Sequence, residues 1–317
     1  MDKATRTIYV AGNVNVDLIL GPLAQWPRIG TETILPHYEL RVGGQAGNTG
    51  LALAALGAHH RLIANMGDDA LGRWLCEAFA DASAAWPRAS APTTVTVGLV
   101  HPSGERTFFT NIGHLAQFSP DQVLAQLPAR AQRGDLVLLC GVFLSPLLVA
   151  GGQGLCEELA RRGFALALDS GWPNQPWSEL RGTVASWLPC MQHVLLNEVE
   201  SLSLSDTPDI EQAAAWLLAR LPPDATLVVK CGPEGARAWR GSRHVHYAAP
   251  AVQVVDTVGA GDVFNAGYLS GIAGGLTLED CVARGVRIAS HAISTSPRRY
   301  GSDATDAGRG PERLRNA

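Results

Sequence analysis

One stretch late in the chain combines a turn of small residues with a carboxylate on each side. Asp256 precedes Gly259, Ala260 and Gly261, and Asp262 follows directly. Because this turn has almost no side chains, its backbone N–H groups can approach an anion, and a helix that begins here adds partial positive charge. Asp262 would repel that anion, but it could take a proton from a nucleophile that approaches the anion. An anion hole beside a base indicates phosphoryl transfer.

Two elements must position this turn. Val252 to Val255 carries β-branched residues and predicts a buried strand, while the small apolar residues 266–273 predict a packed helix. An ordinary strand–turn–helix corner, capped by an aspartate, is the alternative for a lone Gly-x-Gly-Asp.

The N-terminal part of the chain predicts a polar surface suited to a sugar. Residues 13–20 alternate polar and apolar side chains, as in a half-exposed strand, so that Asn13, Asn15 and Asp17 share one face. Three hydrogen-bonding side chains on one face could bind sugar hydroxyls. A solvated edge strand is the alternative.

A second glycine-rich segment follows at Gly43-Gly44, where backbone N–H groups can again approach a ligand. The apolar spacing from Asn48 to Leu56, with Gly57 after it, predicts a short helix closed by a glycine. We expect Asn48 in its first turn, in reach of the same ligand.

The rest of the pattern predicts an α/β fold. From Asp121 helices and strands alternate, which requires a doubly wound, mostly parallel central sheet with helices on both faces. Residues 93–100 and 106–110 predict a hairpin, which with residues 14–42 forms a separate small sheet. We therefore expect one domain over residues 1–317, with a small sheet made from about residues 14–42 and 93–114.

The run Asp-Thr-Val-Gly-Ala-Gly-Asp from Asp256 to Asp262 resembles the C-terminal signature of the ribokinase-like (PfkB) carbohydrate kinases. The resemblance implies that Asp262 is the catalytic base and that Asp256 helps to hold a monovalent cation such as K+. The backbone of Gly259, Ala260 and Gly261 would stabilise the phosphoryl group.

The glycine pair with Asn48 resembles the family's N-terminal signature, which binds the sugar. Gln45 stands where ribokinases commonly carry Lys, which argues against ribose itself. The substrate contacts implied in this way are Asn15, Asp17, Gly43, Gly44 and Asn48.

Two further motifs follow in the family's order. Asn197 and Glu200 resemble an Asn-x-x-Glu motif that organises hydrated Mg2+ beside the phosphates of ATP, although a helix cap explains the same letters. Lys230, Gly232 and Gly235 resemble a loop at the nucleotide.

The predicted small sheet resembles the family's lid, which closes over the sugar and often forms a homodimer contact. Arg106 on this sheet could meet an anionic group of the substrate, or it could pair with Glu105 or another carboxylate. The segment from Asp169 lacks the arginine that kinases of acid sugars use, which favours a neutral sugar or a nucleoside.

Composition excludes several classes of function. The net charge of −4 and the scattered basic residues argue against nucleic acid and anionic membranes as partners. No apolar run is long enough for a membrane helix, and the N-terminus does not resemble a signal peptide, so we expect a cytoplasmic protein. The six cysteines are far apart and indicate neither a zinc site nor a disulfide framework.

We therefore expect an ATP-dependent kinase that phosphorylates a hydroxyl, preferably a primary one, of a sugar. A nucleoside kinase of the same fold and a non-catalytic sugar-binding regulator remain alternatives. A Rossmann dehydrogenase is disfavoured because no Gly-x-Gly-x-x-Gly follows the first strand.

Overall fold

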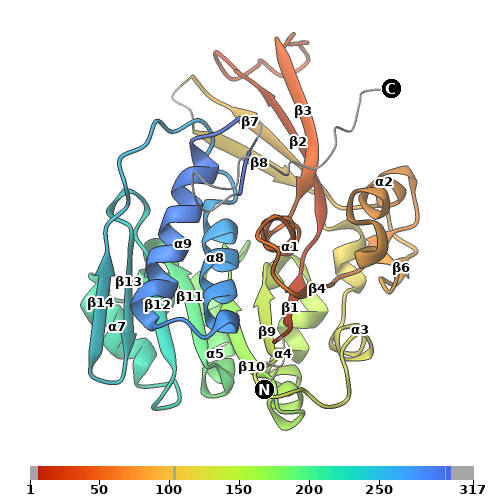
Figure 1. Cartoon of the computed structure of the whole chain (residues 1–317). Helices are drawn as coiled ribbons and strands as arrows, with labels where there is room; N and C mark the ends of the chain where they lie inside the picture. The colour runs from red at the N-terminus through yellow and green to blue at the C-terminus, as the bar shows by residue number, and fades with distance from the viewer. Residues whose placement is uncertain (1–5, 103–104, 297, 301–317) are drawn as a thin grey trace.

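The computed structural model describes residues 6–102, 105–296 and 298–300, and a large sheet runs through its centre (Figure 1). Within these residues the sheet has eight strands in the order β14-β13-β12-β11-β10-β9-β1-β4. The six strands from β12 to β4 are parallel, and β13 and β14 add an antiparallel hairpin at one edge. The strands are β1 (Ile8–Gly12), β4 (His60–Ile63), β9 (Leu136–Cys140), β10 (Ala165–Asp169), β11 (His193–Asn197), β12 (Thr226–Lys230), β13 (Ala236–Arg240) and β14 (Arg243–Tyr247).

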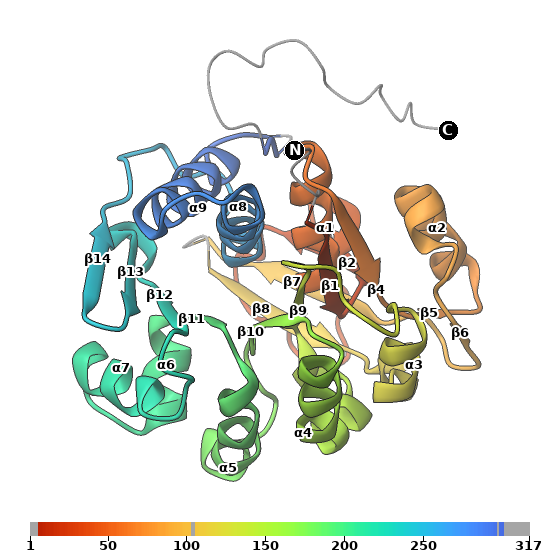
Figure 2. The same cartoon turned by 60° about the horizontal axis from the view of Figure 1, so that its bottom comes forward.

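Helices cover both faces of this sheet, as Figure 2 shows in a view toward its lower edge. The strands β1 and β9 are apolar along their whole length and fully buried, as expected for parallel strands between two helical layers. One face carries α1 (Gln45–Ala55), α8 (Ala260–Gly274) and α9 (Leu278–Ile293). The other carries α3 (Pro120–Ala125), α4 (Pro146–Arg161), α5 (Trp177–Trp187), α6 (Glu198–Ser205) and α7 (Ile210–Leu218).

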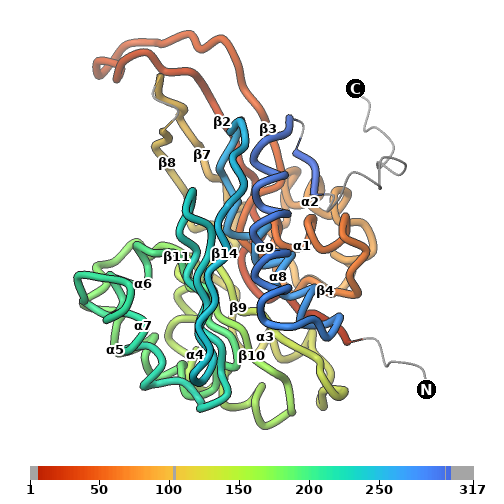
Figure 3. Tube along the Cα trace, turned by 60° about the vertical axis from the view of Figure 1, so that its left-hand side comes forward, coloured from red at the N-terminus to blue at the C-terminus, as the bar shows by residue number. Residues whose placement is uncertain are grey.

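A separate four-stranded sheet stands over the carboxyl ends of the central strands (Figures 1 and 3). Its strand order is β3-β2-β7-β8, and we call it the lid sheet. It consists of β2 (Asn15–Gly21), β3 (His37–Gly43), β7 (Val95–Val100) and β8 (Arg106–Thr110). These strands lie in the two stretches that the sequence assigned to a small sheet.

A smaller unit lies beside the lid sheet. It contains β5 (Met66–Gly67), β6 (Arg88–Ala89) and α2 (Ala70–Phe79). Asp69 caps α2 by accepting a hydrogen bond from Gly72 N–H at 2.8 Å. Within the described part of the chain, no helix has the length and hydropathy needed to cross a membrane.

Three local predictions are wrong. Val252 to Val255 forms no strand: it is an exposed loop, in which the Val255 N–H donates to the Ile293 carbonyl at 2.8 Å. Helix α1 begins at Gln45, before the predicted start at Asn48. Strand β2 is largely buried rather than half-exposed, because it lies between β3 and β7 in the lid sheet and Val16 packs into the hydrophobic core.

Candidate active site

The glycine-rich turn forms the start of α8, at the carboxyl-end side of the central sheet. Gly259 is the N-cap residue, with a φ of 72° that a residue with a side chain rarely adopts. A β-carbon on Gly259 would lie 3.0 Å from Asn48 Nδ2 and 3.1 Å from Arg298 Nη1. A β-carbon on Gly261 would lie 3.3 Å from Lys230 Nζ. The turn of residues 259–261, which we call the cradle, is therefore bordered by two cationic side chains.

Asp262 lies in the first turn of α8 and is buried. Its Oδ2 accepts a hydrogen bond from Asn48 Nδ2 at 2.8 Å, so that a predicted substrate residue and the predicted base are in contact. Burial and the charge of Asp169 raise the pKa of Asp262 to about 7, while Asn48, Lys230 and Gln45 oppose the shift. A carboxylate with a pKa near neutrality is well matched to proton abstraction.

The polar face of β2 is assembled as expected. Asn13 Nδ2 donates to Asn15 Oδ1 at 3.2 Å, and Asn15 Nδ2 donates to Asp17 Oδ1 at 2.8 Å. A β-carbon on Gly43 would lie 2.1 Å from the Asp17 carboxylate, so only glycine leaves room for that group. Gly44, the N-cap of α1, likewise leaves room for the Asn13 carbonyl.

A buried ion pair lies on the Gly261 side of the cradle. Lys230 Nζ contacts Asp169 Oδ2 at 2.7 Å, and Asn265 Nδ2 donates to the same oxygen at 2.5 Å. Asp169 is 1% exposed. Burial works against a charged Lys230, but the charges of Asp169 and Glu200 outweigh it and raise the pKa of Lys230. The lysine therefore stays a cation beside the cradle.

Asn197 and Glu200 form a capping box at the start of α6. Asn197 Oδ1 accepts from Glu200 N–H at 2.8 Å, and Glu200 Oε2 accepts from Asn197 N–H at 2.9 Å. Burial and the charge of Asp169 raise the pKa of Glu200 to about 7. The cap leaves Glu200 Oε1 for a water of hydrated Mg2+, so the residues fit the predicted role.

Asp256 lies among three arginines. Its Oδ2 is 2.8 Å from Arg41 Nη1 and 3.2 Å from Arg298 Nη2, and its Oδ1 is 2.8 Å from Arg106 Nη2. Partial burial opposes ionisation, but the hydrogen bonds from Arg41 and from Val258 N–H lower the pKa of Asp256. The residues present here do not fit a monovalent cation. Three guanidinium groups already surround the carboxylate, and their positive charge would repel the cation.

The same contacts show which carboxylate Arg106 pairs with in the fold. The structure pairs Arg106 with Asp256, a carboxylate outside the lid sheet, and the arginine side chain is 14% exposed.

The predicted nucleotide residues Gly232 and Gly235 lie in the turn after β12, both with positive φ. At Gly235 a β-carbon would lie 2.0 Å from the Tyr247 carbonyl oxygen, so the fold requires a glycine at this position.

Some residues of the site were not predicted. Asp169 ends the apolar strand β10 just as Asn197 ends β11, and this position could have indicated it. Asn265 follows Asp262 by three residues on one helix face, another available signal. Arg41 and Arg298 come from distant parts of the chain and had no local signal. Gln45 stood out in the sequence only because it stands where ribokinases commonly carry Lys. Its side chain partly offsets the rise in the pKa of Asp262.

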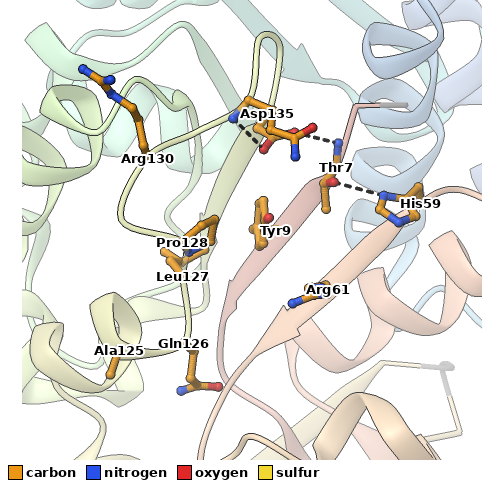
Figure 4. Close-up of a pocket in the computed structure, with 11 residues that line it drawn as sticks. Thr7, Tyr9, His59, Arg61, Ala125, Gln126, Leu127, Pro128, Arg130 and Asp135 are labelled. Atoms are coloured by element: carbon orange, nitrogen blue, oxygen red, sulfur yellow. Dashed lines mark hydrogen bonds between the residues drawn. The ribbon is translucent and has the colours of Figure 1, made fainter. Parts of the chain in front are cut away.

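A cavity of about 220 Å³ adjoins this site. Gln45, Gly171, Trp172 and Glu200 are among its lining residues. A larger cavity of about 490 Å³ lies elsewhere, at the amino ends of β1, β4 and β9, where Thr7, His59 and Asp135 line it (Figure 4). Because the cradle lies toward the carboxyl ends of the strands, this larger cavity is not part of the site.

Comparisons with known proteins identify the family of this chain. Residues 6–303 match the pfkB family carbohydrate kinase. A fructokinase from Klebsiella pneumoniae is 31% identical over 255 residues, which cover 76% of this chain and 81% of that protein. Among solved structures, a ribokinase from Thermotoga maritima aligns with a TM-score of 0.76 at 21% identity, over 92% of this chain and 93% of that one. An adenosine kinase from Sinorhizobium meliloti aligns with a TM-score of 0.77 at 22% identity, over 94% and 97%. The chain belongs to the pfkB family of carbohydrate kinases and is thus an ATP-dependent kinase.

Proposed function

We propose that this kinase transfers the γ-phosphoryl group of ATP to a hydroxyl, preferably a primary one, of a sugar, with Asp262 as the general base. The observation that carries the proposal is the contact of Asp262 with both the cradle and Asn48. Burial in this position gives the carboxyl a pKa of about 7. A group of that pKa can accept a proton at neutral pH without being too weak a base.

The polar face of β2 would hold the sugar through Asn15 and Asp17, with Asn48 at the reacting end. Asp262 takes the proton of the hydroxyl as its oxygen bonds to the γ-phosphorus. The bond from that phosphorus to the β–γ bridging oxygen breaks, and ADP leaves. The N–H groups of the cradle receive the developing negative charge.

Positive charge around the phosphates would come from several groups. Lys230 borders the cradle, and Gly232 and Gly235 shape the loop after β12 that the resemblance assigns to the nucleotide. Asn197 and Glu200 would hold the waters of Mg2+, which when bound neutralises phosphate charge. We do not include a monovalent cation at Asp256, because the arginines described above do not fit one.

The substrate class is open between sugars and nucleosides. The similarity to a fructokinase supports a sugar, and the similarity in fold to an adenosine kinase keeps a nucleoside as the second candidate.

We also propose that the protein forms a homodimer through the outer face of the lid sheet. Trp26 and Phe109 are about half exposed there, with ring centroids 6.1 Å apart. Sedimentation analysis would test this; a monomer at all concentrations would contradict it.

The deciding experiment measures ATP consumption with Mg2+ and a panel of ketoses, aldoses, sugar acids, sugar phosphates and nucleosides. We expect one class of acceptor to stimulate turnover. The Asp262→Asn variant should fold and bind but lose a factor of about 10² to 10⁴ in kcat, the usual contribution of a general base. Normal turnover in this variant would exclude Asp262 as the base. Binding of acceptors without any turnover by the wild type would favour the non-catalytic regulator.

A further inference from the structure

The carboxylate of Asp256 is shared by three guanidinium groups that belong to different parts of the fold. Arg41 comes from β3 and Arg106 from β8, both in the lid sheet, and Arg298 comes from the segment after α9. The side chains of the three arginines are only 14–20% exposed, and that of Asp256 is 22% exposed. This cluster, which we call the arginine cluster, therefore concentrates positive charge in a place with limited access to water.

Nearby carboxylates balance only part of this charge. Asp17 contributes, although burial raises its pKa to about 6. Glu39 is 3.8 Å from Arg41 but half exposed. Within the described residues, Arg41 Nη2 and Arg106 Nε are buried and make no hydrogen bond, and Arg298 Nη2 meets Asp256 Oδ2 only as an ion pair at 3.2 Å. The arginine cluster thus has donors to spare, which is expected where an anion is to bind.

Arg298 places this spare charge at the cradle. Its Nη1 lies 3.1 Å from the point where a β-carbon of Gly259 would stand, next to Asn48 Nδ2. On the other flank, Lys230 Nζ lies 3.3 Å from the corresponding point of Gly261. An anion seated on the cradle would therefore have a guanidinium on one side and an ammonium on the other, each held by its own carboxylate.

We propose that Arg298, held by Asp256, is a catalytic residue that contacts the transferred phosphoryl group, and that its fixed charge makes the reaction independent of monovalent metal ions. The proposal rests on the kinase function proposed above and deepens it. A guanidinium stays charged at every working pH and offers several N–H donors to phosphate oxygens. Arg41 and Arg106 act through Asp256 as positioning residues, and Asp256 sets the place of Arg298.

The test uses ADP with aluminium fluoride as a probe, because the fluoride complex stands in for the phosphoryl group in transfer. Calorimetry with the full-length protein and Mg2+ measures binding of ADP alone and of ADP with aluminium fluoride. Each titration is made in potassium chloride and in tetramethylammonium chloride at equal ionic strength. For the wild type we expect the same affinity in both salts, within about a factor of two.

Arg298→Ala should weaken binding of ADP with aluminium fluoride about 10- to 100-fold, as for loss of a hydrogen bond between charged groups, and leave ADP alone nearly unchanged. Arg298→Lys should recover part of this loss. Arg299→Ala is the matched control, because Arg299 is the next arginine and its side chain is exposed. It should behave as the wild type, and circular dichroism would verify the fold of all variants.

Several results would overturn the inference. One is a tenfold or greater gain in wild-type affinity on adding K+, since a metal ion would then supply the charge. Another is equal behaviour of Arg298→Ala and Arg299→Ala. Failure of every acceptor to consume ATP would overturn the proposed function alone, because probe binding is measured without acceptor. If the wild type binds ADP with aluminium fluoride no better than ADP alone, the inference is overturned but the proposed function is not, because acceptor-stimulated ATP consumption tests that function separately.

Discussion

Two carboxylates flank the cradle, and each holds a cation against it in a different way. Asp169 is almost completely buried and binds Lys230 and Asn265, which come from β12 and α8 of the main body. Asp256 is partly exposed and binds arginines from the lid sheet and from the segment after α9. The first pair depends only on the main body. The second includes Arg41 and Arg106 only while the lid sheet stands in its present position, so it connects the acceptor side of the site with the phosphoryl side.

The largest effect on the free energy of unfolding is expected at the buried Lys230–Asp169 pair. Lys230→Met leaves the Asp169 charge unpaired in the interior and should lower the free energy of unfolding by about 3–5 kcal/mol. Urea denaturation would measure this. The double variant Lys230→Met with Asp169→Asn should recover much of the loss, because no charge is then stranded. A single-variant loss below about 1 kcal/mol would show that water reaches Asp169 and would remove the contrast with Asp256.

A smaller effect on the free energy of unfolding is expected at Asp256 and its arginines. Asp256→Asn should lower the free energy of unfolding by about 1–2 kcal/mol, because partial exposure lets water solvate the arginines. The same denaturation experiment applies. Glu279→Gln is the matched control: its partner Arg243 is 2.9 Å away and both side chains are well exposed, so we expect about 0.5 kcal/mol or less. A loss for Asp256→Asn as large as that for Lys230→Met would mean that the two sides are equally closed to water.

The smallest expected change is in the pH dependence. Asp262 must be ionised to accept a proton, so kcat/KM should fall as the pH drops below its pKa of about 7. Since the charge of Asp169 helps to raise that pKa, Asp169→Asn should move this acidic limb toward lower pH. Asp256→Asn should leave the limb in place. A pH–rate profile of the three proteins is the measurement, and a limb that moves with Asp256 but not with Asp169 would reverse the assignment.

The parts of the fold that depend on local sequence patterns could be predicted, whereas contacts between distant segments without a motif could not. The doubly wound sheet and the lid sheet follow from patterns within short windows, and the motif residues Asn48 and Asp262 meet as expected. The loop at Val252 to Val255 was misjudged because β-branched residues favour a strand only when a neighbouring strand offers backbone partners. Here the carbonyl of Ile293 accepts from the Val255 and Asp256 N–H groups instead.

The surroundings of Asp256 were beyond reach for a related reason. A carboxylate after an apolar run has the same local sequence whether a metal ion or a guanidinium lies beside it. Arg41, Arg106 and Arg298 converge on it only after the lid sheet has folded over the main body. Their partner is fixed by tertiary structure, which no pattern in one stretch of chain encodes.

The packing of α8 against α9 has a consequence for how this protein can diverge. A β-carbon on Gly267 would lie 3.0 Å from Gly285 Cα, and one on Gly285 would lie 2.8 Å from the Phe264 ring. Larger residues at these positions would displace the helix that bears the cradle, so we expect natural variation there to be narrow. In the lid sheet such a restriction falls on Gly43 beside Asp17, and not on exposed positions such as Tyr38 and Phe108. A lineage of such proteins could therefore change its acceptor by substitutions in the lid sheet while phosphoryl-transfer chemistry is inherited unchanged.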